Sequence, residues 1–357
     1  MSRVPPRRDD LALVEGYHSP QVDVDVRLNT NESPYPPPES WRRAYLDELA
    51  GVPFNRYPDR RAPRLRADLA AAHGFEPAQV MAAKGSNEVL QALCLAYGGP
   101  GRSAAVFEPT YALHSHIARI VGTAVVVGER AADFTLDLDE VRRVLDAARP
   151  AITFLCTPNN PTGLVEPREV VEAVLELAPG LVVVDEAYAQ FAPWSALSLL
   201  AERPELPLAV TRTYSKTWSL AALRLGYLVA PAEVVEACES VLLPYHLDAA
   251  AQIAGRVALR YAEDMEARVA AVVAERERLS AALQALPVDV WPSGANFVLF
   301  RPRPLEAADV WKGLVERSVL VRDCASRPRL AGCLRVTVGT PAENDAFLSA
   351  LSEVLCP

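Results

Sequence analysis

A lysine lies between two apolar segments in the stretch Thr211-Arg-Thr-Tyr-Ser-Lys-Thr-Trp-Ser-Leu-Ala-Ala-Leu-Arg-Leu-Gly-Tyr227. This lysine, Lys216, follows the apolar run Leu208 to Val210. Because lysine is normally a solvated surface residue, a lysine in such surroundings indicates Schiff-base chemistry, which needs a desolvated amine beside an aldehyde. Ser215 and Arg224 offer a hydroxyl and a planar group of donors that suit a phosphate. From this stretch alone, an ordinary surface lysine at a strand end stays the alternative.

The composition predicts a soluble globular protein of two domains, or of one large domain with a lobe. The chain has 357 residues, of which 50% are hydrophobic and 23% charged, with a formal net charge of -9. An acidic chain without a basic cluster is a poor partner for nucleic acid or an anionic membrane. The N-terminus lacks the apolar core of a signal peptide, and no apolar stretch is long enough to span a bilayer. We therefore expect a cytoplasmic protein.

The cysteines and histidines predict neither disulfides nor a metal site. Six cysteines are scattered without a Cys-x-x-Cys pair, and most lie in apolar runs, as reduced core thiols do. His114 and His116 are close together, but no carboxylate or cysteine at a ligand spacing completes a set. We expect no bound metal.

Short apolar runs alternate with helical segments after an N-terminal arm. Residues 1–40 are rich in proline and lack periodicity, which indicates an extended arm. The predicted strands are apolar on both faces and rich in β-branched residues: Val80 to Ala83, Ala104 to Phe107, Ala124 to Val127, Ile152 to Cys156, Leu181 to Val184, Leu208 to Val210 and Leu225 to Ala230. Helical periodicity between several of them, as in Leu138 to Ala147 and Arg168 to Leu177, predicts an α/β fold. Its mostly parallel seven-stranded sheet would be covered by helices on both faces.

The C-terminal third alternates differently and predicts a smaller α+β domain. A helix over Pro231 to Leu242 leaves the sheet, and residues 249–285 form one long helical region. Four strands and two helices follow, at Val288 to Val290, Asn296 to Phe300, Val319 to Val321, Leu334 to Val338, Ala307 to Arg317 and Glu343 to Glu353. We therefore divide the chain into the arm (1–40), a large domain (41–240) and a small domain (241–357), with which the arm could pack.

Polar side chains gather where the predicted strands end. In a doubly wound fold, ligands bind outside the carboxyl ends of the strands. Gly85-Ser-Asn-Glu88 follows one strand, and free amides at a helix start, with Ser86 and Asn87, suit a phosphate. Glu108-Pro-Thr-Tyr111 follows the next strand and places the ring of Tyr111 at the sheet edge. Taken singly, these stretches are more typical of a helix N-cap and of a core or surface tyrosine.

Two further strand ends add groups that suit an aromatic heterocycle. Seven small or turn-forming residues, Thr157 to Gly163, follow one strand, and Asn160 among them can donate to a phenolate oxygen. Asp185 ends a buried apolar strand, where a carboxylate needs a cationic partner; a salt bridge or a protonated pyridine nitrogen supplies one. Tyr188 can hydrogen-bond the oxygen of the same ring. Together with the lysine and the phosphate donors, this set matches pyridoxal 5′-phosphate (PLP) group by group.

The sequence resembles the fold-type I PLP-dependent aminotransferases of class I/II, and most of all the histidinol-phosphate aminotransferase branch. The resemblance extends from Leu28 to Leu351. It is carried by Asn29-Thr-Asn-Glu-Ser-Pro-Tyr35, Tyr57-Pro-Asp59, Gly85-Ser-Asn-Glu88, Pro109-Thr-Tyr111, Pro158-Asn-Asn-Pro-Thr-Gly163, Asp185-Glu-Ala-Tyr188, Ser215-Lys216 with Arg224, Ser293-Gly-Ala-Asn-Phe297 and Gly332-Cys-Leu-Arg-Val-Thr-Val-Gly-Thr340. It implies the PLP-transferase fold of type I and a transaminase activity.

The resemblance also implies a role for each cofactor-facing residue. Lys216 would bind the cofactor covalently and then move a proton between the substrate Cα and the cofactor C4′. Asp185 would keep the pyridine nitrogen protonated. Tyr57 would reach the phosphate from a neighbouring subunit, which implies a homodimer with shared active sites. The other implied contacts are Tyr188 and Asn160 on the ring hydroxyl, Tyr111 stacked on the ring, and Ser86, Asn87, Ser215 and Arg224 around the phosphate.

The implied substrates are small molecules. Arg335 would bind the carboxylate of glutamate or 2-oxoglutarate in one half-reaction and the phosphate of histidinol phosphate in the other, since a guanidinium binds either oxyanion bidentately. Arg322 resembles the second phosphate-facing arginine of the branch, with a surface ion pair to Asp323 as the alternative. Tyr17 and Asn29 would close the site from the arm.

Four positions depart from the usual pattern of the branch. Ala222, Thr217-Trp218 and Asp248 stand where glycine, Ala-Phe and serine are common. None removes a catalytic group, so they bear on the substrate. The main hypothesis is a histidinol-phosphate:2-oxoglutarate aminotransferase of histidine biosynthesis, with an aromatic amino-acid aminotransferase or a threonine-phosphate decarboxylase as alternatives. A non-enzymatic sensor domain, as in some transcription regulators, is the remote alternative, because acidic charge opposes DNA contact.

Overall fold

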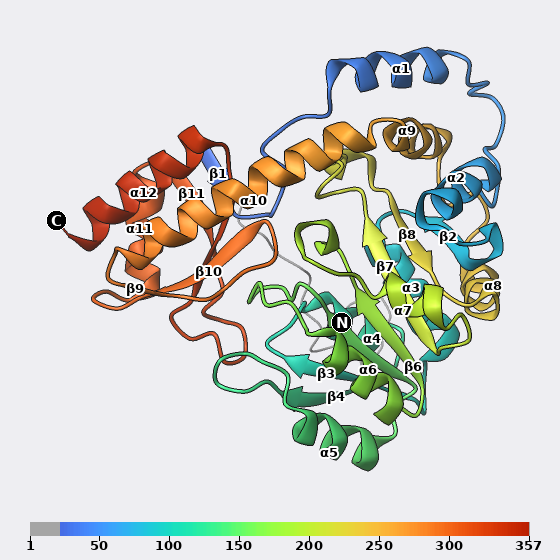
Figure 1. Ribbon diagram of the computed structural model, residues 1–357, viewed down its shortest axis with the longest axis horizontal. Coiled ribbons are helices and arrows are strands. Elements are labelled where there is room, and N and C mark those ends of the chain that lie inside the picture. The colour runs from blue at the N-terminus through green and yellow to red at the C-terminus, as the bar shows by residue number, and fades with distance from the viewer. Residues whose placement is uncertain (1–21, 357) are drawn as a thin grey trace, which may run out of the picture.

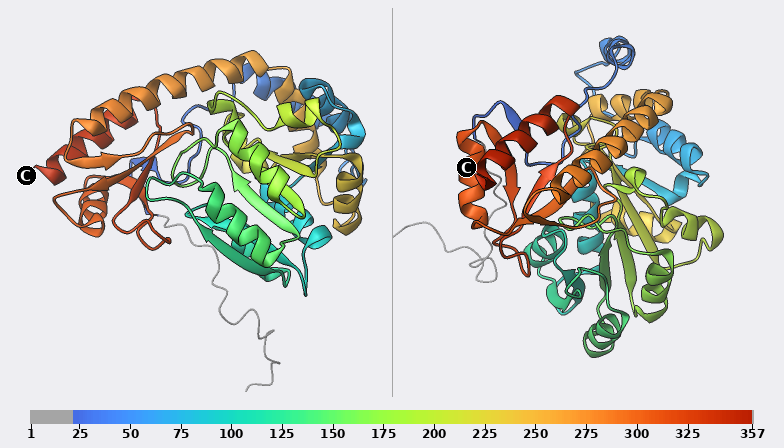
Figure 2. Two further views of the ribbon diagram at one scale, coloured as in Figure 1. Left: turned by 60° about the horizontal axis from the view of Figure 1, so that its bottom comes forward. Right: turned by 60° about the vertical axis from the view of Figure 1, so that its left-hand side comes forward.

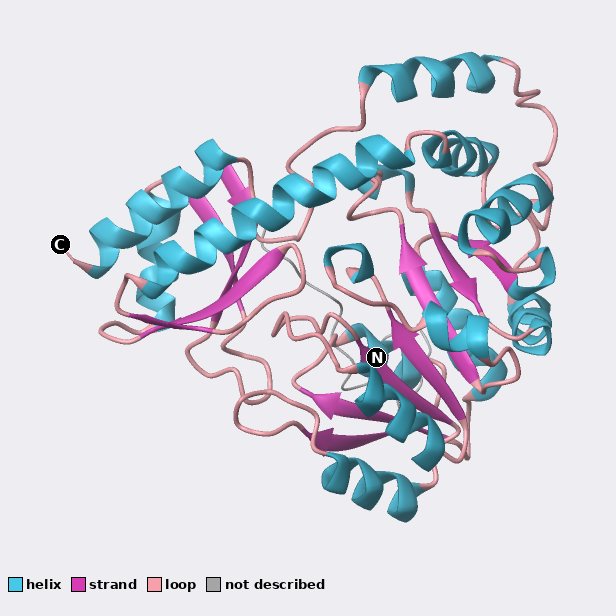
Figure 3. Ribbon diagram, viewed as in Figure 1, coloured by secondary structure: helices cyan, strands magenta, loops and turns pink. Residues whose placement is uncertain are grey.

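The computed structural model describes residues 22–356, which form two lobes, each built on its own β-sheet (Figure 1). The larger lobe holds a seven-stranded sheet in the order β2-β8-β7-β6-β5-β3-β4. Its strands are β2 (Val80–Ala83), β3 (Ser103–Glu108), β4 (Ala124–Glu129), β5 (Ile152–Cys156), β6 (Leu181–Asp185), β7 (Leu208–Thr213) and β8 (Gly226–Val229). Figure 3 shows these strands in magenta, with helices around them.

Parallel pairing brings the ends of the central strands to one edge of the large sheet. The strands β7, β6, β5, β3 and β4 are parallel in this order, whereas β8 is antiparallel to both β7 and β2. The register aligns Cys156 with Asp185, and Asp185 with Thr211. The predicted α/β fold with a mostly parallel seven-stranded sheet is therefore confirmed, and its strand ends form the edge where doubly wound sheets bind ligands.

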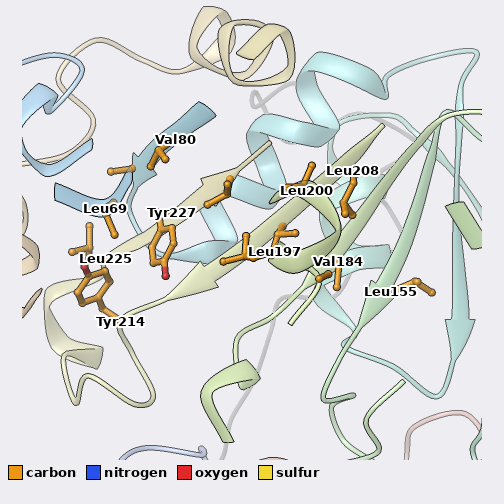
Figure 4. Close-up of a cluster of buried hydrophobic side chains, with 14 of the residues drawn as sticks. Leu69, Val80, Leu155, Val184, Leu197, Leu200, Leu208, Tyr214, Leu225 and Tyr227 are labelled. Carbon is orange, nitrogen blue, oxygen red and sulfur yellow. The ribbon is translucent and has the colours of Figure 1, made fainter. Parts of the chain in front are cut away.

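Helices cover both faces of the large sheet, because successive side chains of its strands enter two different apolar cores. On one face, Val182, Val184 and Val210 pack with residues of α2, α5, α6, α7 and α9, and Figure 4 shows part of this cluster. On the other face, Val183 and Ala209 pack with α3, α4 and α8. The helices of this lobe are α1 (Glu39–Ala50), α2 (Pro63–His73), α3 (Ser86–Tyr97), α4 (Leu113–Ile120), α5 (Leu138–Ala148), α6 (Arg168–Leu177), α7 (Leu197–Glu202), α8 (Ala232–Val241) and α9 (Ala249–Leu259), with short 3-10 turns at Pro77–Gln79, Ala189–Phe191 and Ala221–Leu223.

The smaller lobe contains a five-stranded sheet in the order β1-β11-β12-β10-β9. Its elements are β1 (Val26–Leu28), α10 (Ala262–Gln284), β9 (Val288–Val290), β10 (Phe297–Pro302), α11 (Ala307–Glu316), β11 (Val319–Asp323), β12 (Leu334–Thr337) and α12 (Pro341–Leu355). The first strand comes from the arm and pairs in parallel with β11, so that Val26 is opposite Val319. The arm predicted to be extended therefore contains a strand that completes the sheet of the C-terminal lobe.

Some helices differ from those predicted. The single helical region expected over residues 249–285 is two helices, α9 and α10, which are separated by Arg260 and Tyr261. No proline or glycine marks this break, so periodicity alone could not locate it. Helix α10 then extends from the large lobe to the small one (Figures 1 and 2). Helix α1 begins inside the predicted arm, and the short helices α4 and α7 were not predicted.

In residues 22–356, no helix is both long enough and apolar enough to cross a membrane. The division of the chain at residues 40 and 240 stays a prediction.

Candidate active site

A cavity of about 390 Å³ opens at the edge of the large sheet where β5, β6 and β7 end. Its walls come from the arm, the first turn of α3, the loops after these strands, and β12 of the small lobe. The fold therefore gathers polar groups from distant parts of the chain into one space between the two sheets. The strand-end residues singled out from the sequence lie here.

Lys216 lies in the loop after β7, and its amine points toward the arm. Its Nζ donates a hydrogen bond of 3.0 Å to the backbone carbonyl oxygen of Thr30. Burial lowers the pKa of Lys216 to about 7, with a further contribution from the positive charge of Arg335, while Glu32 acts in the opposite direction. An amine with this pKa is in large part unprotonated at neutral pH, so it is both nucleophilic and basic.

Asp185 is the last residue of β6 and is only 1% exposed. Its Oδ2 lies 3.1 Å from Nε2 of His114, and its Oδ1 accepts a hydrogen bond of 3.1 Å from the backbone N–H of Ala187. His114 stacks on Phe154, with 4.8 Å between the ring centroids. With one imidazole and one amide as partners, the carboxylate keeps the capacity to pair with a cationic group in the cavity.

Donors suited to a phosphate gather around the first turn of α3. Gly85 precedes this helix with a φ of 81°, and a Cβ at this position would lie 3.0 Å from Nη2 of Arg224. Nη1 of Arg224 donates to Oγ of Ser215 at 3.3 Å, and Ser86 is the first residue of the helix. A guanidinium, two hydroxyls and the free N–H groups of a helix start together suit a dianionic phosphate.

Tyr111 and Asn87 form the adjoining wall of the cavity. The hydroxyl of Tyr111 donates to Oδ1 of Asn87 at 3.3 Å. The ring of Tyr111 meets that of His114 edge-on, at an interplanar angle of 86°. An aromatic ring in this position can cover one face of a flat ligand.

Tyr188, Asn160 and Arg335 form a third group, toward the small lobe. Nδ2 of Asn160 lies 3.4 Å from the hydroxyl oxygen of Tyr188, and its Oδ1 accepts a hydrogen bond of 2.6 Å from Nη1 of Arg335. Nη2 of Arg335 donates to the backbone carbonyl of Asn29 at 2.9 Å, and its buried Nε has no partner among the described residues. Burial raises the pKa of Tyr188 above its usual value, so its hydroxyl stays protonated at neutral pH.

A family model described as aminotransferase class I and II matches residues 23–351. The chain belongs to this aminotransferase family. The resemblance found from the motifs is thereby confirmed, and with it the transaminase class and its dependence on PLP.

Two relatives and one solved structure show how close the likeness is. Over 98% of its length, this aminotransferase is 48% identical to a histidinol-phosphate aminotransferase of Frankia casuarinae, of which 90% is covered. It is 43% identical to that of Corynebacterium glutamicum, again over 98% of this chain and 96% of the relative. Its fold is similar to that of histidinol-phosphate aminotransferase from Sinorhizobium meliloti in complex with PLP, with a TM-score of 0.84, 23% identity, and coverage of 93% of this chain and 91% of that one.

The aminotransferase brings most of the predicted site residues to the cavity. Lys216, Asp185, Tyr188, Ser86, Asn87, Tyr111, Asn160, Ser215, Arg224 and Arg335 all line it. Asn29 contacts Arg335 through its backbone carbonyl. Arg322 is directly opposite Arg335 in the register of β11 and β12, so that both side chains lie on one face of the sheet, but it does not line the cavity. Tyr17 lies outside the described residues, and the individual roles stay predictions.

Tyr57 lies away from this cavity. Its ring is 81% exposed and stacks on Tyr245, with 4.5 Å between the centroids. Within one chain of the aminotransferase, Tyr57 therefore does not reach the phosphate donors around α3.

Sequence reasoning missed several residues that shape the cavity. Thr30, Asn31, Glu32 and Thr213 line it, and His114 contacts Asp185. The first three lie within a quoted motif, and His114 is only three positions after Tyr111, so proximity to predicted residues was the usable signal. The cysteines are free, and all except Cys356 are buried. Among the described residues, no group of three or more His, Cys, Asp or Glu side chains could hold a metal ion.

Proposed function

We propose that this aminotransferase converts imidazole acetol phosphate and glutamate into histidinol phosphate and 2-oxoglutarate, a step of histidine biosynthesis. The observation that carries the proposal is the similarity, over nearly the full length, to proteins named histidinol-phosphate aminotransferase. A pair of arginines on one face of the small sheet, Arg335 and Arg322, supports it. Two oxyanions of different shape, a carboxylate and a phosphate, must bind in turn, and guanidinium groups suit both.

The residues of the cavity fit PLP. Asp185 is a buried carboxylate with spare capacity for a protonated ring nitrogen, and Lys216 supplies an amine with a lowered pKa. Gly85 leaves open a space beside Arg224 that a Cβ would occupy, which a phosphate can use. A cavity of about 390 Å³ is within the usual range for small-ligand sites.

In the mechanism, bound PLP supplies an aldehyde for the substrate amine and a ring that accepts the electrons left at Cα. Lys216 would remove the proton from Cα and deliver it to C4′, for which a pKa near 7 is suitable at neutral pH. Asp185 would stabilise positive charge on the ring nitrogen, and its contacts with His114 and Ala187 hold the carboxylate in place. Burial of these groups strengthens their electrostatic interactions.

The remaining cofactor contacts orient the ring. Tyr188 and Asn160 would donate hydrogen bonds to the ring oxygen, and Tyr111 would stack on the ring. The phosphate would be held by Ser86, Asn87, Ser215 and Arg224, together with the first N–H groups of α3. These contacts would fix the orientation of the ring relative to the amine of Lys216.

Arg335 would bind the carboxylate of glutamate and, in the other half-reaction, the substrate phosphate. Its partners Asn160 and Asn29 are neutral, so its positive charge is available to an anion. Arg322 would provide the second contact that a phosphate needs and a simple amino acid does not. Tyr17 would close the site from the arm.

We also propose a homodimer with shared active sites, in which Tyr57 contacts the phosphate bound by the neighbouring subunit. Tyr57 is exposed, as are the nearby Phe54 and the ring partner Tyr245. Large apolar side chains exposed together are typical of an association surface. The cytoplasmic location stays a prediction.

The proposed function is tested by the absorbance spectrum of the purified protein during titration with histidinol phosphate. In the wild type, histidinol phosphate should convert the absorbance band of the bound cofactor to that of the pyridoxamine form. In Lys216→Ala, the band of the cofactor bound to the lysine should be absent. Conversion with glutamate and phenylalanine but not with histidinol phosphate would favour an aromatic amino-acid aminotransferase. Release of carbon dioxide from threonine phosphate would favour the decarboxylase. Equal losses of turnover with histidinol phosphate and phenylalanine in Arg322→Ala would contradict the phosphate role of Arg322.

A further inference from the structure

Asn31 connects the arm to both lobes at the wall of the cavity. It is 1% exposed and has a φ of 54°, in the left-handed region that asparagine tolerates better than most residues. Its Nδ2 lies 2.9 Å from the hydroxyl oxygen of Tyr188 in the large lobe, and its Oδ1 lies 3.2 Å from Oγ1 of Thr337 in the small lobe. Its backbone carbonyl accepts a hydrogen bond of 3.1 Å from Asn296.

The surrounding donors determine which way the amide of Asn31 faces. Its backbone N–H donates to Oγ1 of Thr337 at 3.0 Å, and a backbone N–H can only donate. Oγ1 of Thr337 therefore accepts this bond, and its own hydrogen is available for Oδ1 of Asn31. With Oδ1 of Asn31 bound to this hydrogen, the NH2 group at the other end of the amide faces Tyr188.

The amide of Asn160 is oriented by the same logic. Arg335 has no acceptor, so the atom that its Nη1 contacts at 2.6 Å is the oxygen of Asn160. The NH2 group of Asn160 then faces the hydroxyl oxygen of Tyr188, at 3.4 Å. Both amides thus present hydrogens to the oxygen of Tyr188, and neither offers an acceptor for the hydroxyl hydrogen.

We propose that Asn31 is a positioning residue that, together with Asn160, directs the hydroxyl hydrogen of Tyr188 into the cavity, toward an anionic ring oxygen. Tyr188 lines the cavity, so its hydrogen has a free direction there. Burial keeps the hydroxyl protonated, as its raised pKa indicates. The inference rests on the proposed function only in taking the ring oxygen to be that of PLP.

The substitution Asn31→Asp tests this orientation with little change of shape. Aspartate also tolerates a positive φ, and Thr337 can still donate to one of its oxygens. The other carboxylate oxygen carries no hydrogen, so the hydroxyl of Tyr188 must donate to it. The hydroxyl hydrogen of Tyr188 then points toward residue 31 and no longer into the cavity. Asn31→Gly is the matched control, because it keeps the backbone conformation and removes one donor without adding an acceptor.

The measurements are the dissociation constant of PLP for the apo protein and the pH at which the absorbance of the bound cofactor changes. Asn31→Asp should weaken PLP binding by roughly fivefold, the effect of one hydrogen bond, and Asn31→Gly by less. Asn31→Asp should also raise the pH of the absorbance change, as Tyr188→Phe should, because an anionic oxygen that loses a hydrogen-bond donor becomes more basic and holds a nearby proton more firmly. In the Tyr188→Phe background, Asn31→Asp should add nothing.

Other outcomes would overturn the proposal. If Asn31→Asp left both readouts at the wild-type values, Asn31 would not orient Tyr188. If its effect were undiminished in the Tyr188→Phe background, Asn31 would act through another contact. If Asn31→Asp fails to fold, Thr337→Val is the second variant, because it removes the hydroxyl that orients the amide of Asn31. It must also weaken PLP binding and raise the pH of the absorbance change. Unchanged values of both would contradict the proposal. Both readouts are measured without substrate. If the wild-type protein did not convert histidinol phosphate, the proposed function would be contradicted, but the test of Asn31 could still be interpreted.

Discussion

Asp185 and Glu186 are neighbours in the chain and are equally buried, each 1% exposed, but their surroundings differ. Glu186 accepts hydrogen bonds from Arg212 at 2.8 and 3.0 Å, from Ser195 at 2.8 Å and from the backbone of Ala196 at 2.6 Å. Asp185 has one imidazole and one amide as partners. The charge of Glu186 is therefore neutralised by Arg212 of the same chain. Asp185 has no such cationic partner among these contacts, so its carboxylate can pair with a positively charged ligand group.

The buried arginines differ in the same way. Arg130 is 2% exposed and is paired with Glu166 at 2.5 Å, with further bonds to two backbone carbonyls. Arg335 is 8% exposed and bonds to neutral oxygens of Asn160 and Asn29. A buried charge is costly unless it is paired. The incompletely paired charges of Asp185 and Arg335 therefore indicate the site where a charged ligand binds.

The largest expected effect is that of Lys216→Ala, at the cavity. Turnover should fall by at least about 10⁴-fold, because the proton at Cα loses its base and the cofactor its covalent anchor. The free energy of unfolding of the apo protein should not decrease, since a partly buried amine is removed. Turnover assays and urea denaturation check the two statements. Turnover within tenfold of the wild type would show that another group moves the proton.

For Arg212→Met, which removes the cationic partner of Glu186, we expect a loss of stability rather than a specific loss of turnover. Glu186 would become a buried carboxylate without its cation, and the free energy of unfolding should fall by about 3–5 kcal/mol. Urea denaturation measures this loss. Adding Glu186→Leu should restore most of it, because no charge then stays unpaired. If the double variant were no more stable than the single one, the loss would come from packing rather than from charge.

A smaller effect, on substrate binding, is expected for Arg335→Lys. This substitution keeps the positive charge but removes the planar guanidinium group that binds an oxyanion bidentately. The KM values for glutamate and for histidinol phosphate should each rise by about tenfold to a hundredfold, the effect of one hydrogen bond to an ion. Steady-state kinetics with each substrate measure this. Arg278→Lys, at an exposed ion pair on α10, is the matched control and should leave both KM values unchanged. A rise for only one substrate would show that Arg335 does not serve both half-reactions.

The smallest effect concerns pH. The pKa of Lys216 is about 7 in the folded apo protein, below the usual lysine value, so between these two pKa values the unfolded chain binds more protons than the folded one. Stability should therefore rise with pH from about 7 to about 10, by less than about 1.4 kcal/mol per pH unit because the amine is partly exposed. The difference in stability between the wild type and Lys216→Met, measured by urea denaturation at several pH values, should follow this slope. A difference that is flat with pH would contradict the lowered pKa.

The sequence predicted the large sheet well because its signals are local. Strands such as Leu181–Asp185 are short apolar runs with turn-forming residues after them, and the edge they form follows from parallel pairing. Many of the side chains that line the cavity come directly after these runs, so their position could be predicted without any knowledge of packing.

The rest depended on contacts between distant parts of the chain. The arm strand Val26–Leu28 is too short to have a pattern of its own and is stabilised by pairing with β11. Asn31 and His114 look like ordinary loop and helix residues until the fold places them against Tyr188 and Asp185. Arg322 was predicted from its motif alone, and the position of its side chain depends on the register of the small sheet.

The pairing of β1 with β11 has a consequence for the newly made protein. Strand β1 leaves the ribosome before its partner β11, which follows after a delay on the order of tens of seconds at usual rates of synthesis. Until then, Thr30 and Asn31 have no small sheet to hold them against Lys216 and Tyr188. The complete cavity therefore exists only once β11 and β12 have been made.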